Sequence, residues 1–110
     1  MPSFSSNGIR LAYETFGHGP PVLLIHGFAS NIEINWVAPG WVDVLTKAGY
    51  QVIAIDNRGH GQSQKLYDPK LYRARDMAED AARLLDHLGI GRAAVMGYSM
   101  GARISAFLSL

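Results

Sequence analysis

Apolar and polar positions divide the chain into short, distinct segments. Unbroken apolar runs occupy residues 22–25, 52–55 and 93–96, and runs of this length are typical of strands buried on both faces of a parallel sheet. Ahead of them, apolar and polar residues alternate over 9–14, directly after Asn7 and Gly8, which together form a strong hairpin turn signal. The pattern predicts an N-terminal β hairpin followed by three parallel strands.

Between the apolar runs, apolar residues recur at the spacing of an amphipathic helix. One apolar stripe with steps of three and four residues ends before Gly49, and a longer one ends before Gly89, each glycine acting as a stop signal. The first stripe consists of Trp41, Val44, Leu45 and Ala48, and the second of Ala74, Met77, Ala78, Ala81, Leu85 and Leu88. The opposite face of the second predicted helix is expected to lie in solvent, and it carries Arg73, Arg75, Asp76, Glu79, Asp80 and Arg83. A third helix is expected to open at Gly101.

This order of elements predicts an α/β fold in which right-handed βαβ crossovers follow the hairpin. Residues 1–110 are expected to form one incomplete domain, because the helix that opens at Gly101 has no stop signal before the last residue. The sheet is therefore expected to be truncated after this helix, which leaves strand 93–96 as a bare apolar edge. Self-association through that edge is expected, with Phe107, Leu108 and Leu110 partly exposed.

Composition narrows the range of functions. Ten basic residues nearly cancel nine acidic ones, so no nucleic acid is expected as a partner. The absence of cysteine excludes disulfides, thiolate–zinc sites and a cysteine nucleophile. The four histidines have no metal-ligand spacing, and neither a metal nor another cofactor is expected. With no membrane-spanning run and no signal-peptide pattern at the start, the expected location is the cytoplasm.

The motif with the clearest chemistry is Gly-Tyr-Ser-Met-Gly at 97–101, which directly follows an apolar run and opens a predicted helix. A G-x-S-x-G sequence in this place lifts its serine clear of the sheet on a sharp strand-to-helix turn, and the glycines let strand and helix pass each other. The motif predicts Ser99 as a nucleophile with a positive φ. The simpler alternative is a serine that only caps the helix.

Two further motifs follow the other apolar runs. His-Gly-Phe at 26–28 follows the first, and Asp-Asn-Arg-Gly-His-Gly-Gln-Ser at 56–63 follows the second. A backbone amide of 26–28 is expected to point toward Ser99 and, with the amide of Met100, to form an oxyanion hole. His26 and His60 are candidates for a catalytic base, although a role in shaping the two loops is favoured for both. Asp56 and Arg58 are expected to tie the second loop down.

In this order, Gly-Pro-Pro-Val-Leu-Leu-Ile-His-Gly-Phe at 19–28, the motif at 56–63 and Gly-Tyr-Ser-Met-Gly resemble the α/β-hydrolase family. The resemblance extends over 19–101 and corresponds to the N-terminal part of that fold. It implies Ser99 as the nucleophile, the amides of Phe28 and Met100 as oxyanion donors, and a triad acid and histidine that come later than this chain reaches. Serine at position 99 argues against the haloalkane dehalogenase and epoxide hydrolase branches, which resemble this sequence but use aspartate there.

The resemblance implies a serine hydrolase that acts on an ester, thioester or lactone of small-molecule size through an acyl-enzyme at Ser99. The chain of 110 residues alone is expected to be inactive. One alternative is an enzyme that cleaves or eliminates at carbon–carbon bonds, in which Arg103 would contact a carboxylate, although an exposed Arg103 is the plainer interpretation. Another is a non-catalytic binding protein of the same fold. A flavodoxin-like nucleotide binder is disfavoured because no phosphate-binding loop is present.

Three aromatic residues are candidates for lining an acyl pocket: Phe28, Trp36 and Trp41. Trp41 also belongs to the apolar stripe of the first predicted helix. We therefore expect Trp41 in the core rather than in the pocket.

Overall fold

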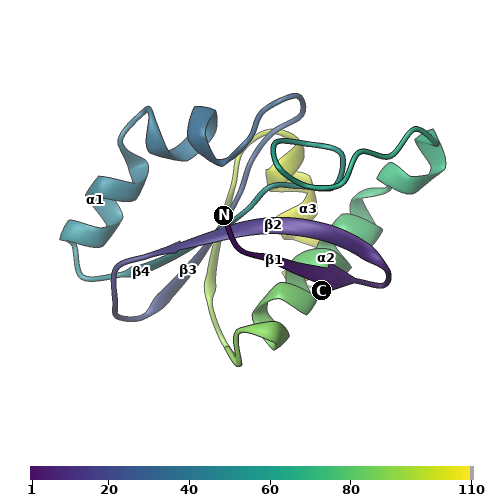
Figure 1. The fold of residues 1–110 in the computed structure, drawn as a ribbon. Helices are drawn as coiled ribbons and strands as arrows, with labels where there is room; N and C mark the ends of the chain where they lie inside the picture. The colour runs from purple at the N-terminus through teal and green to yellow at the C-terminus, as the bar shows by residue number, and fades with distance from the viewer. Residues whose placement is uncertain (110) are drawn as a thin grey trace.

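The structure is a computed structural model and describes residues 1–109. In chain order the elements are β1 (Ser3–Ser6), β2 (Ile9–Phe16), β3 (Pro21–Ile25), η1 (Glu33–Val37), α1 (Trp41–Lys47), β4 (Gln51–Ile55), η2 (Pro69–Tyr72), α2 (Ala74–His87), β5 (Ala94–Gly97) and α3 (Met100–Ser109). η1 is a short π-helical turn and η2 a 3₁₀ turn. The sheet runs through the middle, with α1 on one side and α2 and α3 together on the other (Figure 1).

The strands form one mixed sheet in the order β1-β2-β4-β3-β5. The hairpin of β1 and β2 turns at Asn7 and Gly8, whose φ angles of 50° and 87° lie in the left-handed region that this turn requires. β2 pairs antiparallel with β4, whereas β3 pairs parallel with both β4 and β5. The predicted hairpin and parallel strands are confirmed, although β5 is Ala94–Gly97 rather than 93–96.

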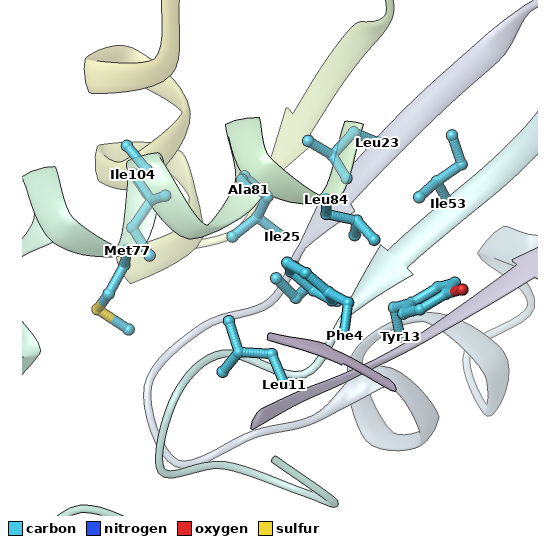
Figure 2. Close-up of a cluster of buried hydrophobic side chains, with 12 residues drawn as sticks. Phe4, Leu11, Tyr13, Leu23, Ile25, Ile53, Met77, Ala81, Leu84 and Ile104 are labelled. Carbon is cyan, nitrogen blue, oxygen red and sulfur yellow. The ribbon is translucent and has the colours of Figure 1, made fainter. Parts of the chain in front are cut away.

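Side chains of the central strands are buried alternately on the two faces of the sheet. On β3, Leu23 and Ile25 belong to a core cluster with α2 and α3, whereas Val22 and Leu24 belong to a second cluster with α1 and η1. Figure 2 shows the first cluster, in which side chains of both helices close over those of the strands. Burial on both faces explains why β3 is an unbroken apolar run.

The buried face of α1 is not the predicted one. Val42 is buried and Leu45 half-buried, whereas Val44 is 60% exposed and Trp41 44% exposed. The prediction that Trp41 lies in the core is therefore wrong. Helix α1 has only seven residues, and in so short a helix more than one stripe has helical spacing. The tertiary contacts of α1 with β4 and η1 select the face.

Helix α2 carries a buried charge on the side predicted to lie in solvent. Asp80 is 1% exposed, and its carboxylate accepts hydrogen bonds from Nε and Nη2 of Arg58, both at 2.7 Å, and from Ser6 Oγ at 2.5 Å. The prediction of a solvated Asp80 is therefore wrong. A buried carboxylate needs a cationic or hydrogen-bonding partner. The hydrogen bond with Asp80 also raises the pKa of Arg58, which stays protonated.

The remaining helix predictions are mostly confirmed. On α2, Met77, Ala78 and Ala81 are buried as predicted, although Leu84 rather than Leu85 is fully buried. α3 begins at Met100 instead of Gly101. Phe107 is 37% exposed and Leu108 half-buried, as expected, and Leu110 lies outside the described residues.

We predict that Asp80→Leu lowers the free energy of unfolding by about 3 kcal/mol or more, because it leaves the buried guanidinium of Arg58 without its counter-charge. Chemical denaturation measures the change. The matched control is Glu79→Gln on the same helix, since Glu79 pairs with Arg83 at 3.6 Å in solvent and such pairs contribute about 0–1 kcal/mol. Equal losses in the two variants would contradict the role assigned to the buried ion pair.

We also predict that the 110-residue chain, expressed alone, self-associates through β5. Within the described residues β5 pairs with β3 on one side only, and Ala94 on it is exposed. An unprotected strand edge is a template for further strand addition. Size-exclusion chromatography with light scattering measures the association, and Ala94→Lys should reduce it because an edge lysine opposes pairing. A monomeric peak with cooperative unfolding would show the prediction to be wrong.

Candidate active site

The register of the parallel strands brings three loops to one end of the sheet. Ile25, the last residue of β3, lies opposite Ile55 at the end of β4 and Gly97 at the end of β5. The segments that follow these residues therefore leave the sheet at the same level. They are the three motifs identified in the sequence. The carboxyl ends of parallel strands are where open α/β sheets place their ligand sites.

Ser99 lies on a sharp turn between β5 and α3. Its φ of 56° confirms the predicted left-handed conformation, and the residue is exposed. A Cβ atom on Gly97 would lie 2.2 Å from the carbonyl oxygen of Gly101, and one on Gly101 would lie 1.9 Å from that of Ile25. Both distances are far shorter than a van der Waals contact, so only glycine fits at either position. The motif glycines thus let α3 begin directly against the strands, with Ser99 at the apex.

The two predicted oxyanion donors, the amides of Met100 and Phe28, have no acceptor within residues 1–109, and neither has the amide of Ser99 itself. The amides of Ala29 and Gly101, by contrast, both donate to protein acceptors. An amide without a protein acceptor is available to a ligand, as an oxyanion donor must be. That the two amides converge on one oxyanion stays a prediction.

His26 is fully buried and uses both ring nitrogens. Its Nε2 accepts a hydrogen bond from the Asn57 amide at 2.9 Å, so the proton sits on Nδ1, which donates to the Gly27 carbonyl at 2.7 Å. Burial, with a smaller contribution from nearby His60, lowers the pKa of His26 and keeps the ring neutral. With no free nitrogen, His26 has no capacity to take a proton from Ser99, and the favoured loop-shaping role is confirmed.

His60 has an equivalent arrangement in the loop after β4. Its Nε2 accepts from the Ala29 amide at 3.1 Å, and Nδ1 donates to the Arg58 carbonyl at 2.9 Å. The loop-shaping role is again confirmed. Asp56 adds a third tie, because its carboxylate accepts from the amides of Ile32 and Gln62, each at 2.9 Å. The loops after β3 and β4 are thus joined by side chains that reach backbone groups of both.

A cavity of about 520 Å³ opens beside Ser99. Its aromatic walls are Phe28, Trp36, Trp41 and Tyr98. Trp36 is 1% exposed, and its Nε1 is the one buried side-chain polar atom without a hydrogen-bond partner in the described part of the chain. Phe28 and Trp36 line this cavity, and Trp41 joins them there instead of entering the core. That the cavity receives an acyl group stays a prediction.

Sequence reasoning missed Asn35 on η1. Its Oδ1 accepts a hydrogen bond from the Gly27 amide at 3.0 Å, next to the proposed oxyanion donor. An isolated asparagine in a segment without helical or strand periodicity gives no sign of this contact. The one local signal is Asn31, whose Oδ1 accepts from the Ile34 amide at 2.8 Å and opens the turn.

Other features of the described residues bear on the remaining expectations. Arg103 is exposed, as expected, and lines a second cavity of about 560 Å³ with Arg73 and Arg75. Across residues 1–109, no three histidine, aspartate or glutamate side chains lie close enough together to bind a metal ion. No helix in the same range has the length and apolar character that a membrane span requires.

We predict that stability falls as the pH drops below about 6.5, the ordinary pKa of histidine, toward the lowered pKa of His26. In that window the unfolded chain binds the proton more readily than the folded one, so the free energy of unfolding decreases with decreasing pH. His26→Gln removes this titration and should flatten the dependence measured by denaturant unfolding at several pH values. His18→Gln, which changes an exposed turn residue, should leave it unchanged. An unaltered slope in His26→Gln would contradict the assignment.

Comparisons with known proteins agree with this geometry. The family described as "alpha/beta hydrolase fold" matches residues 20–110. Epoxide hydrolase B of Mycobacterium tuberculosis is 38% identical over 90 residues, which cover 79% of this chain and 24% of that protein. Epoxide hydrolase VrEH1 from Vigna radiata has a TM-score of 0.87 and 27% identity, covering 97% of this chain and 34% of that structure.

A third similar protein is Est816, described as an N-acyl homoserine lactone degrading enzyme. It has a TM-score of 0.84 and 32% identity, and the match covers 98% of this chain and 39% of that structure. The chain therefore spans between 24% and 39% of the length of these three proteins. The family match extends over most of the sequence and includes the strand ends, the loops and the turn at Ser99. The chain belongs to the α/β-hydrolase family.

Proposed function

We propose that the whole protein is a serine hydrolase that cleaves a carboxylic ester, thioester or lactone through an acyl-enzyme at Ser99. The observation that carries the proposal is Ser99 at φ 56° on the turn between β5 and α3, beside a cavity with aromatic walls. The amides of Phe28 and Met100, which have no acceptor within the described residues, are the donors that we assign to acyl transfer.

The chemistry follows from these groups. Ser99 Oγ forms a bond to the substrate's carbonyl carbon, and the carbonyl π electrons move to the oxygen, where the two amides donate to the oxyanion. A general base takes the Ser99 Oγ proton and passes it to the leaving oxygen or sulfur as the C–O π bond re-forms and the C–O or C–S single bond breaks. The acyl group remains on Ser99, and in a lactone the released hydroxyl stays attached to it. Water then attacks the acyl-enzyme and releases the acid. A general base is needed in both steps, and the whole protein has to supply it outside His26 and His60.

The similar epoxide hydrolases suggest epoxide hydrolysis as an alternative reaction, and the serine at position 99 argues against it. A carboxylate that opens an epoxide forms an ester, which water hydrolyses. A serine that opened an epoxide would form an ether, which water does not cleave under the same conditions, and the enzyme would stop after one turnover. Ser99 therefore favours acyl substrates, and the similar protein Est816 is described as degrading a lactone, which belongs to this class.

Two other candidate functions can be distinguished from ester hydrolysis by the substrates that the protein turns over. An enzyme acting at carbon–carbon bonds would process carbonyl substrates without a hydrolysable ester, with Arg103 as the candidate contact for a carboxylate. A binding protein of the same fold would turn over neither class. Arg103 is exposed and lines a different cavity from Ser99, which supports the ester hydrolase.

We predict that the whole protein hydrolyses p-nitrophenyl acetate and that Ser99→Ala lowers kcat by about 10⁶-fold, as expected when a triad serine is lost. The 110-residue chain alone should not turn over the ester, because His26 and His60 hold both ring nitrogens in other hydrogen bonds. The release of p-nitrophenolate is the measurement.

The control for this experiment is Ser105→Ala on the same helix, six residues beyond Ser99, which should leave kcat unchanged. Hydrolysis by the short chain that disappears in Ser99→Ala would contradict the assignment of the two histidines. Multiple turnovers of styrene oxide by the whole protein would contradict the ester proposal.

A further inference from the structure

We propose that His60 and Asn35 are positioning residues of the oxyanion hole. Together with His26 they hold the consecutive peptide planes around Phe28 and so fix the direction in which its N–H points. The inference rests on the proposed function, because the oxyanion is that of acyl transfer. Below, residues 26–29 are called the oxyanion loop.

Three peptide planes of the oxyanion loop are each held by a different side chain. The amide of Gly27 donates to Asn35 Oδ1 at 3.0 Å, the carbonyl of Gly27 accepts from His26 Nδ1 at 2.7 Å, and the amide of Ala29 donates to His60 Nε2 at 3.1 Å. The N–H of Phe28 belongs to the middle plane. Within residues 1–109 this N–H has no acceptor. The donors on either side of it are occupied, and the central one is left for a ligand.

This arrangement opposes a flip of the middle peptide plane. In a trans peptide the N–H points away from the preceding carbonyl. In the proposed arrangement the Phe28 N–H faces the oxyanion, and a flip of the plane between Gly27 and Phe28 would put the Gly27 carbonyl in its place. A flip requires rotation about both neighbouring α-carbons, and the hydrogen bonds to Asn35 and His60 fix the planes beyond them.

Two further hydrogen bonds reach the oxyanion loop: the Gly27 carbonyl also accepts from the Ser30 amide at 3.3 Å, and the His26 carbonyl accepts from Asn57 Nδ2 at 3.2 Å. Apolar packing adds little. Phe28 is 76% exposed, so burial does not anchor the middle residue. Ala29 has a φ of 59°, a conformation that residues with a Cβ seldom adopt. Hydrogen bonds, most of them from side chains, therefore have to stabilise a conformation that neither the burial of Phe28 nor local preference favours.

His60 is itself held in place. Its Nδ1 donates to the Arg58 carbonyl, and its ring meets the Phe28 ring edge-on, with centroids 5.8 Å apart and planes at 77°. The Arg58 side chain in turn is fixed by the buried Asp80 of α2. The oxyanion loop is thereby braced against α2 through the loop that follows β4.

The kinetic test uses the whole protein and p-nitrophenyl acetate. His60→Phe keeps an aromatic ring but has no acceptor for the Ala29 amide, so we expect kcat to fall about 10- to 100-fold with little change in KM, since loss of a donor acts mainly on the transition state. Asn35→Leu should act in the same sense. His60→Gln places an amide oxygen at the position of Nε2 and should keep kcat within about 3-fold of the wild type. His18→Phe, in an exposed turn, is the control and should have no effect.

Equal losses in His60→Phe and His60→Gln, or a change confined to KM, would overturn the positioning role. Amide hydrogen exchange of the whole protein tests the hydrogen bond between the Ala29 amide and His60 separately. The Ala29 amide should be protected in the wild type and in His60→Gln, and should exchange freely in His60→Phe. A freely exchanging Ala29 amide in the wild type would overturn the proposal whatever the reaction. If the Ala29 amide is protected but the wild type hydrolyses no ester, the proposed function fails, and the oxyanion role fails with it. The hydrogen bond that holds the oxyanion loop to His60 is then still supported.

Discussion

The parallel register of β3 with β4 and β5 is the constraint that positions everything else in the structure. Because Ile25 lies opposite both Ile55 and Gly97, three loops leave the sheet at one level and meet without any long excursion. A shift by one residue would turn the buried side chains of β3 to the opposite face of the sheet. The two core clusters on the faces of the sheet therefore fix the register, and the register places the candidate site.

Buried polar side chains hold the loops that apolar packing cannot hold. His26, Asp56 and His60 each reach backbone groups outside their own positions, and all three are buried. Loop backbone buried beside a sheet must find hydrogen-bond partners, and here side chains supply them. The neutral state of His26 is part of this arrangement, because its Nε2 has to accept from the Asn57 amide. Rigid loops of this kind are what preorganised catalysis requires.

The fold alone does not decide the reaction. The chain is similar over a large part of its length to epoxide hydrolases and to a protein described as a lactone-degrading enzyme, and one fold commonly serves several chemistries. On our proposal, the side chain at the apex of the turn and the amides near it decide the reaction. A serine there, with the amides of Phe28 and Met100 that have no acceptor within residues 1–109, suits the attack on a carbonyl carbon that our proposal assigns to it.

Elements whose cause is local could be predicted from the sequence, and the rest could not. Asn7 and Gly8 specify the hairpin turn because both tolerate positive φ, and the glycines at 97 and 101 specify the turn that carries Ser99. Such signals sit in consecutive residues or in fixed short periods, which a sequence displays directly. The burial of Asp80, by contrast, depends on Arg58, 22 residues earlier, and on Ser6, 74 residues earlier. The place of Trp41 in the pocket and the contact of Asn35 with the Gly27 amide likewise depend on partners outside their own segments, about which helical or strand periodicity carries no information.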